Sequence, residues 1–208
     1  MTAAAREALD RGLAELELEV SADQVERLHL LAQRVAAWGE QINLTGHRGA
    51  LAVARRLVLD AAALLAAGPP YTSLADLGAG AGFPGLPIAI LCPEIRVTLV
   101  EARQRRHHFQ RAVRRELGLE NVSPVRGRIE EMEATPHEAV VAQALAQADR
   151  ALAWMLPWAQ PDGWLLIPGG EKPPAIGSTA GVRGIEVREY RVPASGPRRT
   201  LWLARRAS

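Results

Sequence analysis

The chain of 208 residues is 48% hydrophobic and 23% charged, which suits one α/β domain with a sizeable core and a modest extension. No run of about 18 apolar residues occurs, so no membrane-spanning helix is expected. The single cysteine, Cys92, excludes an internal disulfide framework and favours a cytoplasmic protein. The formal net charge of +2 shows that the chain as a whole is not a strongly basic nucleic-acid binder.

The first third of the chain is predicted to be helical. Apolar residues recur at helical spacing, and Ser21 with Gln24 has the spacing of a capping box. A Pro-Pro pair follows this region, so we expect an N-terminal helical extension over residues 1–68 and a second domain over residues 69–208. Three helices are predicted in the extension, over residues 2–19, 21–41 and 48–67.

The most informative stretch is residues 76–85, which read DLGAGAGFPG. A short apolar approach predicts a strand over residues 71–75, and helix-compatible apolar residues follow over 86–91. A strand, alternating glycines and a helix start bring backbone N–H groups close to a bound nucleotide. Glycines are needed there because a Cβ would hold off the ligand or forbid the turn.

The carboxylate of Asp76, just before the first glycine, distinguishes between ligands. It would repel a pyrophosphate, but it suits a ligand with an ammonium group, such as the methionine end of S-adenosylmethionine. The next predicted strand, over residues 96–100, ends in Glu101, where an acidic residue binds ribose hydroxyls in both nucleotide families. A methyl-donor site is favoured.

Two alternatives to a methyl-donor site remain for the glycine-rich stretch. One is a plain tight turn. The other is a dinucleotide fingerprint on Gly80, Gly82 and Gly85, although Phe83 and Pro84 interrupt the expected helix entry. A glycine-rich loop combined with a second strand that ends in Glu is more specific than a lone glycine motif.

From residue 71 onward, strands and helices alternate, which predicts a parallel sheet with crossover helices. Pro124 indicates that the strand containing it is short or lies at an edge. After the strand predicted over 71–75 and the helix over 86–91, we expect strands over 96–100, 121–125, 139–142 and 164–167, helices over 103–117 and 144–158, a loop over 168–184, and a closing hairpin over 184–192 and 199–204.

Arginine supplies 24 of the 25 basic residues, and eight of these arginines crowd one short stretch. Clustered arginine beside a cofactor site is typical of phosphate binding, and a solvated helix face is the alternative. The cluster comprises Arg103, Arg105, Arg106, Arg111, Arg114, Arg115, Arg126 and Arg128.

The sequence gives little support for a metal site or for a catalytic nucleophile. The five histidines show no ligand spacing with cysteine or carboxylates, so no metal site is expected. No G-x-S-x-G elbow occurs.

Several motifs together closely resemble the RsmG family, the bacterial small-subunit ribosomal RNA guanine-N7 methyltransferases of the glucose-inhibited division protein B type. The resemblance runs from about residue 10 to residue 205. It is carried by Trp38 with residues 42–45 (INLT), by residues 76–87, by Arg105-Arg106 with Phe109, by residues 116–122 (ELGLENV) and by residues 128–131 (RIEE).

The resemblance implies an α/β, class I (Rossmann-like) methyltransferase fold with a mostly parallel sheet, a C-terminal antiparallel hairpin and the N-terminal helical extension. It implies S-adenosylmethionine as cofactor, and we expect a monomeric, cytoplasmic enzyme that acts on 16S rRNA in the small ribosomal subunit. Residues expected at the cofactor are Asp76, Gly78, Gly80, Gly82, Phe83, Glu101, Ile129, Glu130 and Gln143, and those expected at the RNA are Arg103, Arg105, Arg106, Arg126 and Arg128.

The departures from the family's pattern cluster near the expected chemistry. The family's Ser-Arg-Ala motif reads Ala142-Gln143-Ala144, so Gln143 stands at the arginine position. The family's Lys-Gly after the fifth strand reads Pro168-Gly169. A histidine and a serine of the third helix and a basic C-terminal tail are also replaced or missing; the two helix positions are Leu57 and Ala61.

The expected reaction is an in-line displacement at the sulfonium methyl group. Guanine N7 has a free lone pair and no proton to remove, so no catalytic acid or base is expected, and positioning carries the rate. The alternative is a weakened or repurposed relative that binds S-adenosylmethionine or the ribosome without methylating that guanine. A methyltransferase for another substrate and a nicotinamide dehydrogenase are more distant alternatives.

Overall fold

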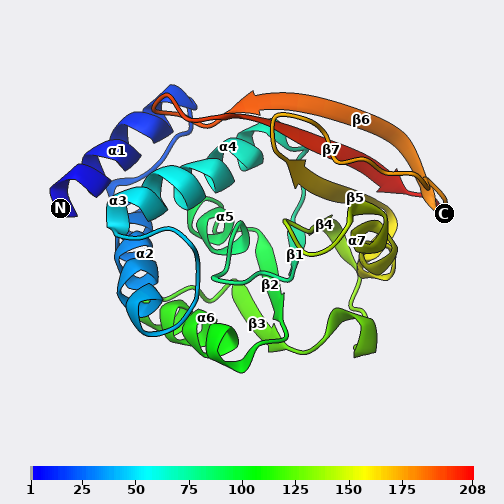
Figure 1. Cartoon of the computed structure of the whole chain (residues 1–208), viewed down its shortest axis with the longest axis horizontal. Helices are drawn as coiled ribbons and strands as arrows, with labels where there is room; N and C mark the ends of the chain where they lie inside the picture. The colour runs from blue at the N-terminus through cyan, green and yellow to red at the C-terminus, as the bar shows by residue number, and fades with distance from the viewer. Residues whose placement is uncertain (1) are drawn as a thin grey trace.

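The computed structural model describes residues 2–208 and shows a seven-stranded sheet flanked by helices (Figure 1). The strand order is β3-β2-β1-β4-β5-β7-β6, and β7 runs antiparallel to both β5 and β6 while the other pairs are parallel. The strands are β1 Ser73–Leu77, β2 Arg96–Glu101, β3 Val122–Arg126, β4 His137–Val141, β5 Ala159–Gly169, β6 Val182–Arg191 and β7 Arg198–Arg206.

This sheet confirms the predicted α/β class, the mostly parallel sheet and the antiparallel C-terminal hairpin. It also confirms that the strand with Pro124 lies at an edge, because β3 ends the strand order. The helices are α1 Thr2–Glu15, α2 Ala22–Gln41, α3 Ala50–Val53, α4 Leu59–Ala67, α5 Gly85–Leu91, α6 Gln104–Glu116 and α7 Ala148–Met155, with a π-helical turn η1 at Ala54–Val58 and 3₁₀ turns η2 at Ile129–Glu131 and η3 at Leu156–Trp158. No helix within residues 2–208 is long and apolar enough to cross a membrane.

Side chains along each parallel strand alternate between two cores on opposite faces of the sheet. Leu74 and Leu99 point into the larger core, which also contains buried residues of α1, α2, α4, α5 and α6. Ala75 and Val100 point into the smaller core, with buried residues of α7. The helices therefore divide unequally between the two faces, and Figure 1 shows α7 on the opposite side of the strands from α5 and α6.

The N-terminal helices are joined to the sheet by hydrogen bonds as well as by this shared core. The predicted capping box of α2 is present, with reciprocal bonds between Ser21 and Gln24. The amide group of Gln24 also donates to the carbonyl oxygens of Ile90 and Leu91, at 3.0 and 2.9 Å. Gln24 thus connects the start of α2 to the end of α5; the domain boundary at residue 68 stays a prediction.

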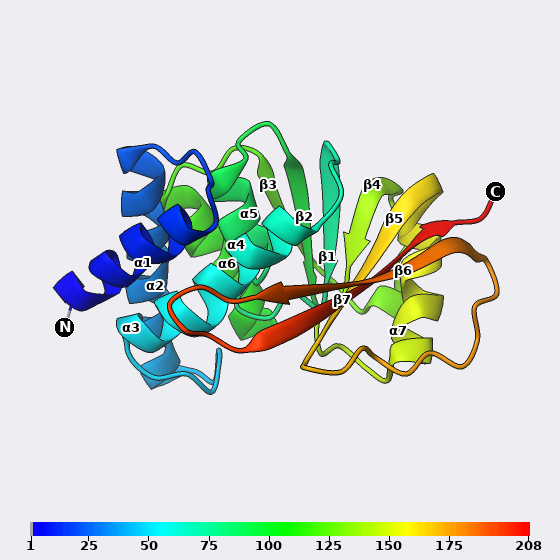
Figure 2. The ribbon, with the colours of Figure 1, turned by 90° about the horizontal axis from the view of Figure 1, so that it is seen from above.

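The β6–β7 hairpin connects the two sides of the molecule, and Figure 2 shows it running from the N-terminal helices across to the side of α7. The backbone N–H of Ala194, at the hairpin tip, donates to the carboxylate of Glu15 at 2.8 Å. Arg188 on β6 donates to the carbonyl oxygen of Ala67 at 3.0 Å. The hairpin therefore holds the ends of α1 and α4 against the sheet.

Three predicted boundaries were wrong for local backbone reasons. The helix predicted over 2–19 ends at Glu15, since Glu17 has a φ of +55°. The helix predicted over 144–158 begins only at Ala148, because Ala144 has a φ of +50°. The strand predicted over 164–167 begins at Ala159, since the Asp162-Gly163 turn is a local irregularity inside β5.

The substitution Gln24→Glu tests the connection between α2 and α5. A carboxylate cannot donate to the two carbonyl oxygens at the end of α5, so the free energy of unfolding is expected to fall by about 2 kcal/mol. Urea denaturation measures this change, with the exposed Gln41→Glu as the matched control, which should cost less than about 0.5 kcal/mol. Equal losses in both variants would show that the connection contributes nothing.

Candidate functional site

The glycine-rich loop between β1 and α5 is fixed to the end of β2 by its own backbone. The N–H groups of Gly78 and Ala79 both donate to the carbonyl oxygen of Val100, at 2.9 and 3.0 Å. The Gly80 peptide is held from two directions, since its N–H donates to Glu101 Oε2 at 3.0 Å and its carbonyl oxygen accepts from Gln110 Nε2 at 2.9 Å. The loop therefore has one defined conformation.

Glycine is required in this loop for two separate reasons. Gly78 has a φ of +73°, in the left-handed region, and a Cβ there would lie 2.4 Å from Leu145 Cδ1. Gly82 has a φ of +85°, and its Cβ would lie 2.3 Å from Leu86 Cδ1. A side chain at either position would distort the loop or displace its neighbours.

A cavity of about 410 Å³ opens beside this loop, at the carboxyl ends of the parallel strands. Ligands of open α/β sheets bind at this edge. The cavity brings together seven of the predicted site residues, which come from three separate segments of the chain: Gly78, Glu101, Arg103, Arg106, Arg128, Ile129 and Glu130. Its remaining lining residues are Val100, Ala102, Gly127, Ala144, Leu145 and Trp154.

Glu101 is the central carboxylate of the cavity and is only 5% exposed. Besides the bond from Gly80, it accepts a backbone bond from Arg103 at Oε1, 2.7 Å away. Arg106 Nη1 lies 3.8 Å from Oε2. This carboxylate therefore fixes the loop and the start of α6 while one edge of it borders the cavity.

Asp76 lies behind the loop rather than in the cavity. Its side chain is buried, Oδ2 accepts from the backbone N–H of Gly85 at 2.9 Å, and Oδ1 has no partner among residues 2–208. Burial raises the pKa of the Asp76 carboxyl to about 7. The hydrogen bond from Gly85 gives this buried carboxyl a role in supporting the loop, and its contact with a ligand ammonium group stays a prediction.

The other predicted residues lie outside the main cavity. Gly80 and Gly82 shape the loop without bordering the cavity, and Arg105 and Arg126 are exposed on α6 and at the end of β3. Phe83 and Gln143 instead border a separate narrow pocket, which is lined by Leu57, Asp60, Ala61, Leu64, Phe83, Pro84, Gln143 and Tyr190.

The narrow pocket contains a buried polar cluster that we did not predict. Asp60 is 7% exposed, its Oδ1 accepts from the Tyr190 hydroxyl at 3.4 Å, and its Oδ2 lies 3.4 Å from Arg199 Nη2. Burial raises the pKa of Asp60, and the positive charge of Arg199 opposes that rise. No signal in the sequence connects these residues, since α4 and the β6–β7 hairpin are far apart along the chain.

Gln110 is the second residue that we did not predict. It is fully buried on α6, next to the apolar Phe109 and Val113, and its amide holds the Gly80 carbonyl. A glutamine on the buried face of a predicted helix was the only available signal. Residues 42–45, which carry part of the family resemblance, also reach the site, because Arg106 donates to the carbonyl oxygen of Asn43 at 3.4 Å.

Solved structures with the same arrangement define the class of protein. A SAM-dependent methyltransferase from Aquifex aeolicus superposes with a TM-score of 0.56 at 16% identity, covering 74% of this chain and 93% of that chain. The M. jannaschii protein TYW2 in complex with AdoMet gives a TM-score of 0.51 at 14% identity, covering 91% of this chain and 78% of that chain. At these identities the likeness shows the fold alone, and the fold is that of the class I, Rossmann-like methyltransferases.

Sequence comparisons identify the family. The family model described as rRNA small subunit methyltransferase G (GidB) matches residues 24–185. The Ribosomal RNA small subunit methyltransferase G of Chromohalobacter salexigens is 38% identical over 211 residues, covering 100% of both chains, and that of Anaeromyxobacter sp. is 32% identical over 212 residues, covering 95% of this chain and 97% of the relative. The chain belongs to the rRNA small subunit methyltransferase G family, which confirms the resemblance seen in its motifs.

Asp76→Asn tests the buried carboxyl behind the loop. The folded-state pKa of about 7 lies above the usual 3.8, so the folded protein holds a proton that the unfolded chain releases between these values. This contribution to stability is complete below pH 3.8 and is lost as pH rises through about 7. As the pH rises from 5 to 8, the loss of this contribution should lower the free energy of unfolding of the wild type by about 3 kcal/mol.

Urea unfolding of the wild type and Asp76→Asn at both pH values isolates this titration, since the other titrating groups are common to both proteins. The variant should show the shallower pH dependence. Parallel curves for the two proteins would contradict the assignment.

Proposed function

We propose that the protein transfers the methyl group of S-adenosylmethionine to N7 of a guanine in 16S rRNA of the small ribosomal subunit. The observation that carries this proposal is the fixed Gly78–Gly80 loop beside the Glu101 cavity. Membership of the rRNA small subunit methyltransferase G family and the methyltransferase fold support it.

The residues of the cavity fit the proposed cofactor. A volume of about 410 Å³ lies in the range of small-molecule sites. The Glu101 carboxylate has acceptor capacity left for ribose hydroxyls, and the Ile129 side chain offers an apolar surface to a flat base. Gly78 and Glu130 border the same cavity, and we assign Gly78 to the amino-acid end of the cofactor and Glu130 to the edge of the adenine.

When bound, the sulfonium supplies an activated methyl group. The chain contributes positioning, since guanine N7 carries a lone pair and no proton has to be removed. Phe83, Gln143 and the Asp60–Tyr190 pair border the narrow pocket next to the glycine-rich loop. Its volume of about 10 Å³ is too small for a base, so we assign the acceptor guanine to the surface beside this pocket. Asp76 supports the loop from behind through Gly85.

We infer that the basic residues at the rim contact RNA phosphates. Arg103, Arg106 and Arg128 border the cavity, and Arg105 and Arg126 are exposed beside it. A guanidinium group often binds a phosphate through two parallel N–H···O hydrogen bonds. Such contacts position an RNA without reading its base sequence.

We also infer a monomeric enzyme that acts in the cytoplasm. Among residues 2–208, the exposed large hydrophobic side chains are Ile185 and Val187. Two such side chains on β6 do not make the large apolar surface that an obligate dimer buries.

Gln143 favours a second candidate function, a relative that binds the cofactor or the ribosome without methylating this guanine. A neutral amide borders the acceptor-side pocket at the position where the family carries an arginine. The pocket's carboxylate instead has Arg199, from the hairpin, as its cation.

Methyl transfer distinguishes the two candidates. Labelled S-adenosylmethionine is incubated with small subunits that lack guanine-N7 methylation, and fully methylated subunits serve as the control acceptor. We expect label in 7-methylguanine of the 16S rRNA. Cofactor binding without transfer, together with a gain of activity in Gln143→Arg, would establish the second candidate instead.

Gln110→Leu tests the fixed loop independently of RNA. Leucine has a similar size, so the fold should persist, but the Gly80 carbonyl loses its donor. We expect the dissociation constant for S-adenosylmethionine to rise by about tenfold, which corresponds to about 1.4 kcal/mol. Calorimetric titration measures it, and the exposed Gln41→Leu is the control; an unchanged affinity would remove Gln110 from the site.

A further inference from the structure

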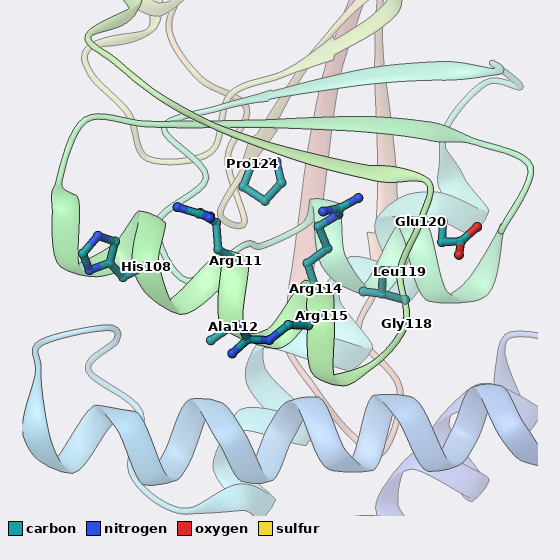
Figure 3. A pocket seen from close by; sticks show the side chains of 9 residues that line it. All are labelled: His108, Arg111, Ala112, Arg114, Arg115, Gly118, Leu119, Glu120 and Pro124. Atoms are coloured by element: carbon teal, nitrogen blue, oxygen red, sulfur yellow. The ribbon is translucent and has the colours of Figure 1, made fainter.

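A second basic surface lies on α6, beyond the residues that border the cofactor cavity. It is a groove of about 550 Å³ between the second half of α6 and β3, and Figure 3 shows its side chains. We call it the α6 groove, and it is lined by His108, Arg111, Ala112, Arg114, Arg115, Gly118, Leu119, Glu120 and Pro124.

The three arginines of the α6 groove make no ion pair with any residue between 2 and 208, although neighbouring basic residues do. For example, Arg34 Nη2 on α2 lies 2.5 Å from Glu116 Oε1 at the end of α6. In Figure 3 the side chains of Arg111 and Arg114 extend from α6 toward the side of Pro124. The lining of the groove contains three arginines and one carboxylate, that of Glu120, so the groove carries excess positive charge.

The groove shares no lining residue with the cofactor cavity, but both are lined by residues of helix α6. Arg106, in the first turn of α6, borders the cavity, while Arg115 lies in the last turn. Arg115 lies nine positions after Arg106, so the two residues are about 13.5 Å apart along the helix axis at a rise of about 1.5 Å per residue. Basic side chains therefore extend from the cofactor edge toward the opposite edge of the sheet.

The chemistry of the groove fits a phosphodiester backbone better than a protein. Guanidinium groups one helical turn apart suit phosphates that repeat along a strand. Protein interfaces are enriched in Trp and Tyr anchors at their centre, and the groove contains neither, since its apolar residues are Ala112, Leu119 and Pro124. The exposed large hydrophobic side chains of the described chain lie on β6 instead.

We propose that the α6 groove is a second RNA-docking surface that binds the phosphodiester backbone of the substrate RNA away from the methylated guanine. This inference rests on the proposed function for the identity of the RNA. It adds a contact surface that is not part of the cofactor cavity or its rim.

The test removes the three charges together, as Arg111→Gln, Arg114→Gln and Arg115→Gln in one variant. A second variant replaces the same three residues with lysine and keeps the charge. The matched control carries Arg55→Gln, Arg191→Gln and Arg198→Gln, three exposed arginines outside the groove. All replaced side chains are at the surface, and thermal unfolding checks that each variant folds.

Binding to protein-free 16S rRNA is titrated at several salt concentrations between 50 and 200 mM. Each lost phosphate contact lowers the slope of log affinity against log salt by about 1. We expect the glutamine variant to lose about two to three units of slope and to bind roughly tenfold more weakly at the lower salt. The lysine variant and the control should keep the wild-type slope.

Kinetics separate this surface from the reaction site. On small subunits the glutamine variant should raise KM for the subunit, keep kcat at saturation and keep the wild-type affinity for S-adenosylmethionine. If the glutamine variant keeps the wild-type salt slope, the proposal is overturned. It is also overturned if this variant loses binding to poly-glutamate but not to RNA, because that result would indicate an acidic protein partner. The proposed function fails separately, if the wild type binds RNA but methylates no subunit.

Discussion

The candidate site depends on how one peptide group, that of Gly80, is held. Its N–H is bound by a buried carboxylate at the end of β2 and its carbonyl oxygen by a buried amide on α6. Two partners from different elements leave the peptide no other orientation without breaking a buried hydrogen bond. The cavity beside it is therefore preformed, and a ligand meets a backbone that needs no reorganisation.

The acceptor side of the site is built on a different principle. Here a neutral Gln143 stands beside a buried carboxyl, Asp60, whose cation comes from the far hairpin. Such a pair is costly to break and sensitive to its surroundings, since each charge has lost most of its water. The loop beside the Glu101 cavity is thus fixed by backbone hydrogen bonds, while the side that we propose for the acceptor is set by side chains, among them Gln143.

The sequence predicts the local features well and the long-range ones poorly. The capping box, the edge strand with Pro124 and seven of the residues that border the cavity each follow from a motif of a few neighbouring residues. Asp76 shows the limit, because its position before the glycines is the same whether it points at a ligand or at Gly85. The Asp60 cluster could not be found at all, since its partners are brought together only when the hairpin crosses α4.

Helix α6 has Arg106 in its first turn, beside the cavity, and Arg114 and Arg115 of the basic groove in its last turn. Its middle is packed into the core through Phe109 and Val113, so the two ends keep a constant separation. The helix therefore sets the distance between the basic groove and the glycine-rich loop. If the α6 groove binds RNA as proposed, a folded RNA is selected by whether its backbone passes the groove at the right distance from an accessible guanine, so that shape rather than base sequence decides which nucleotide reaches the methyl donor.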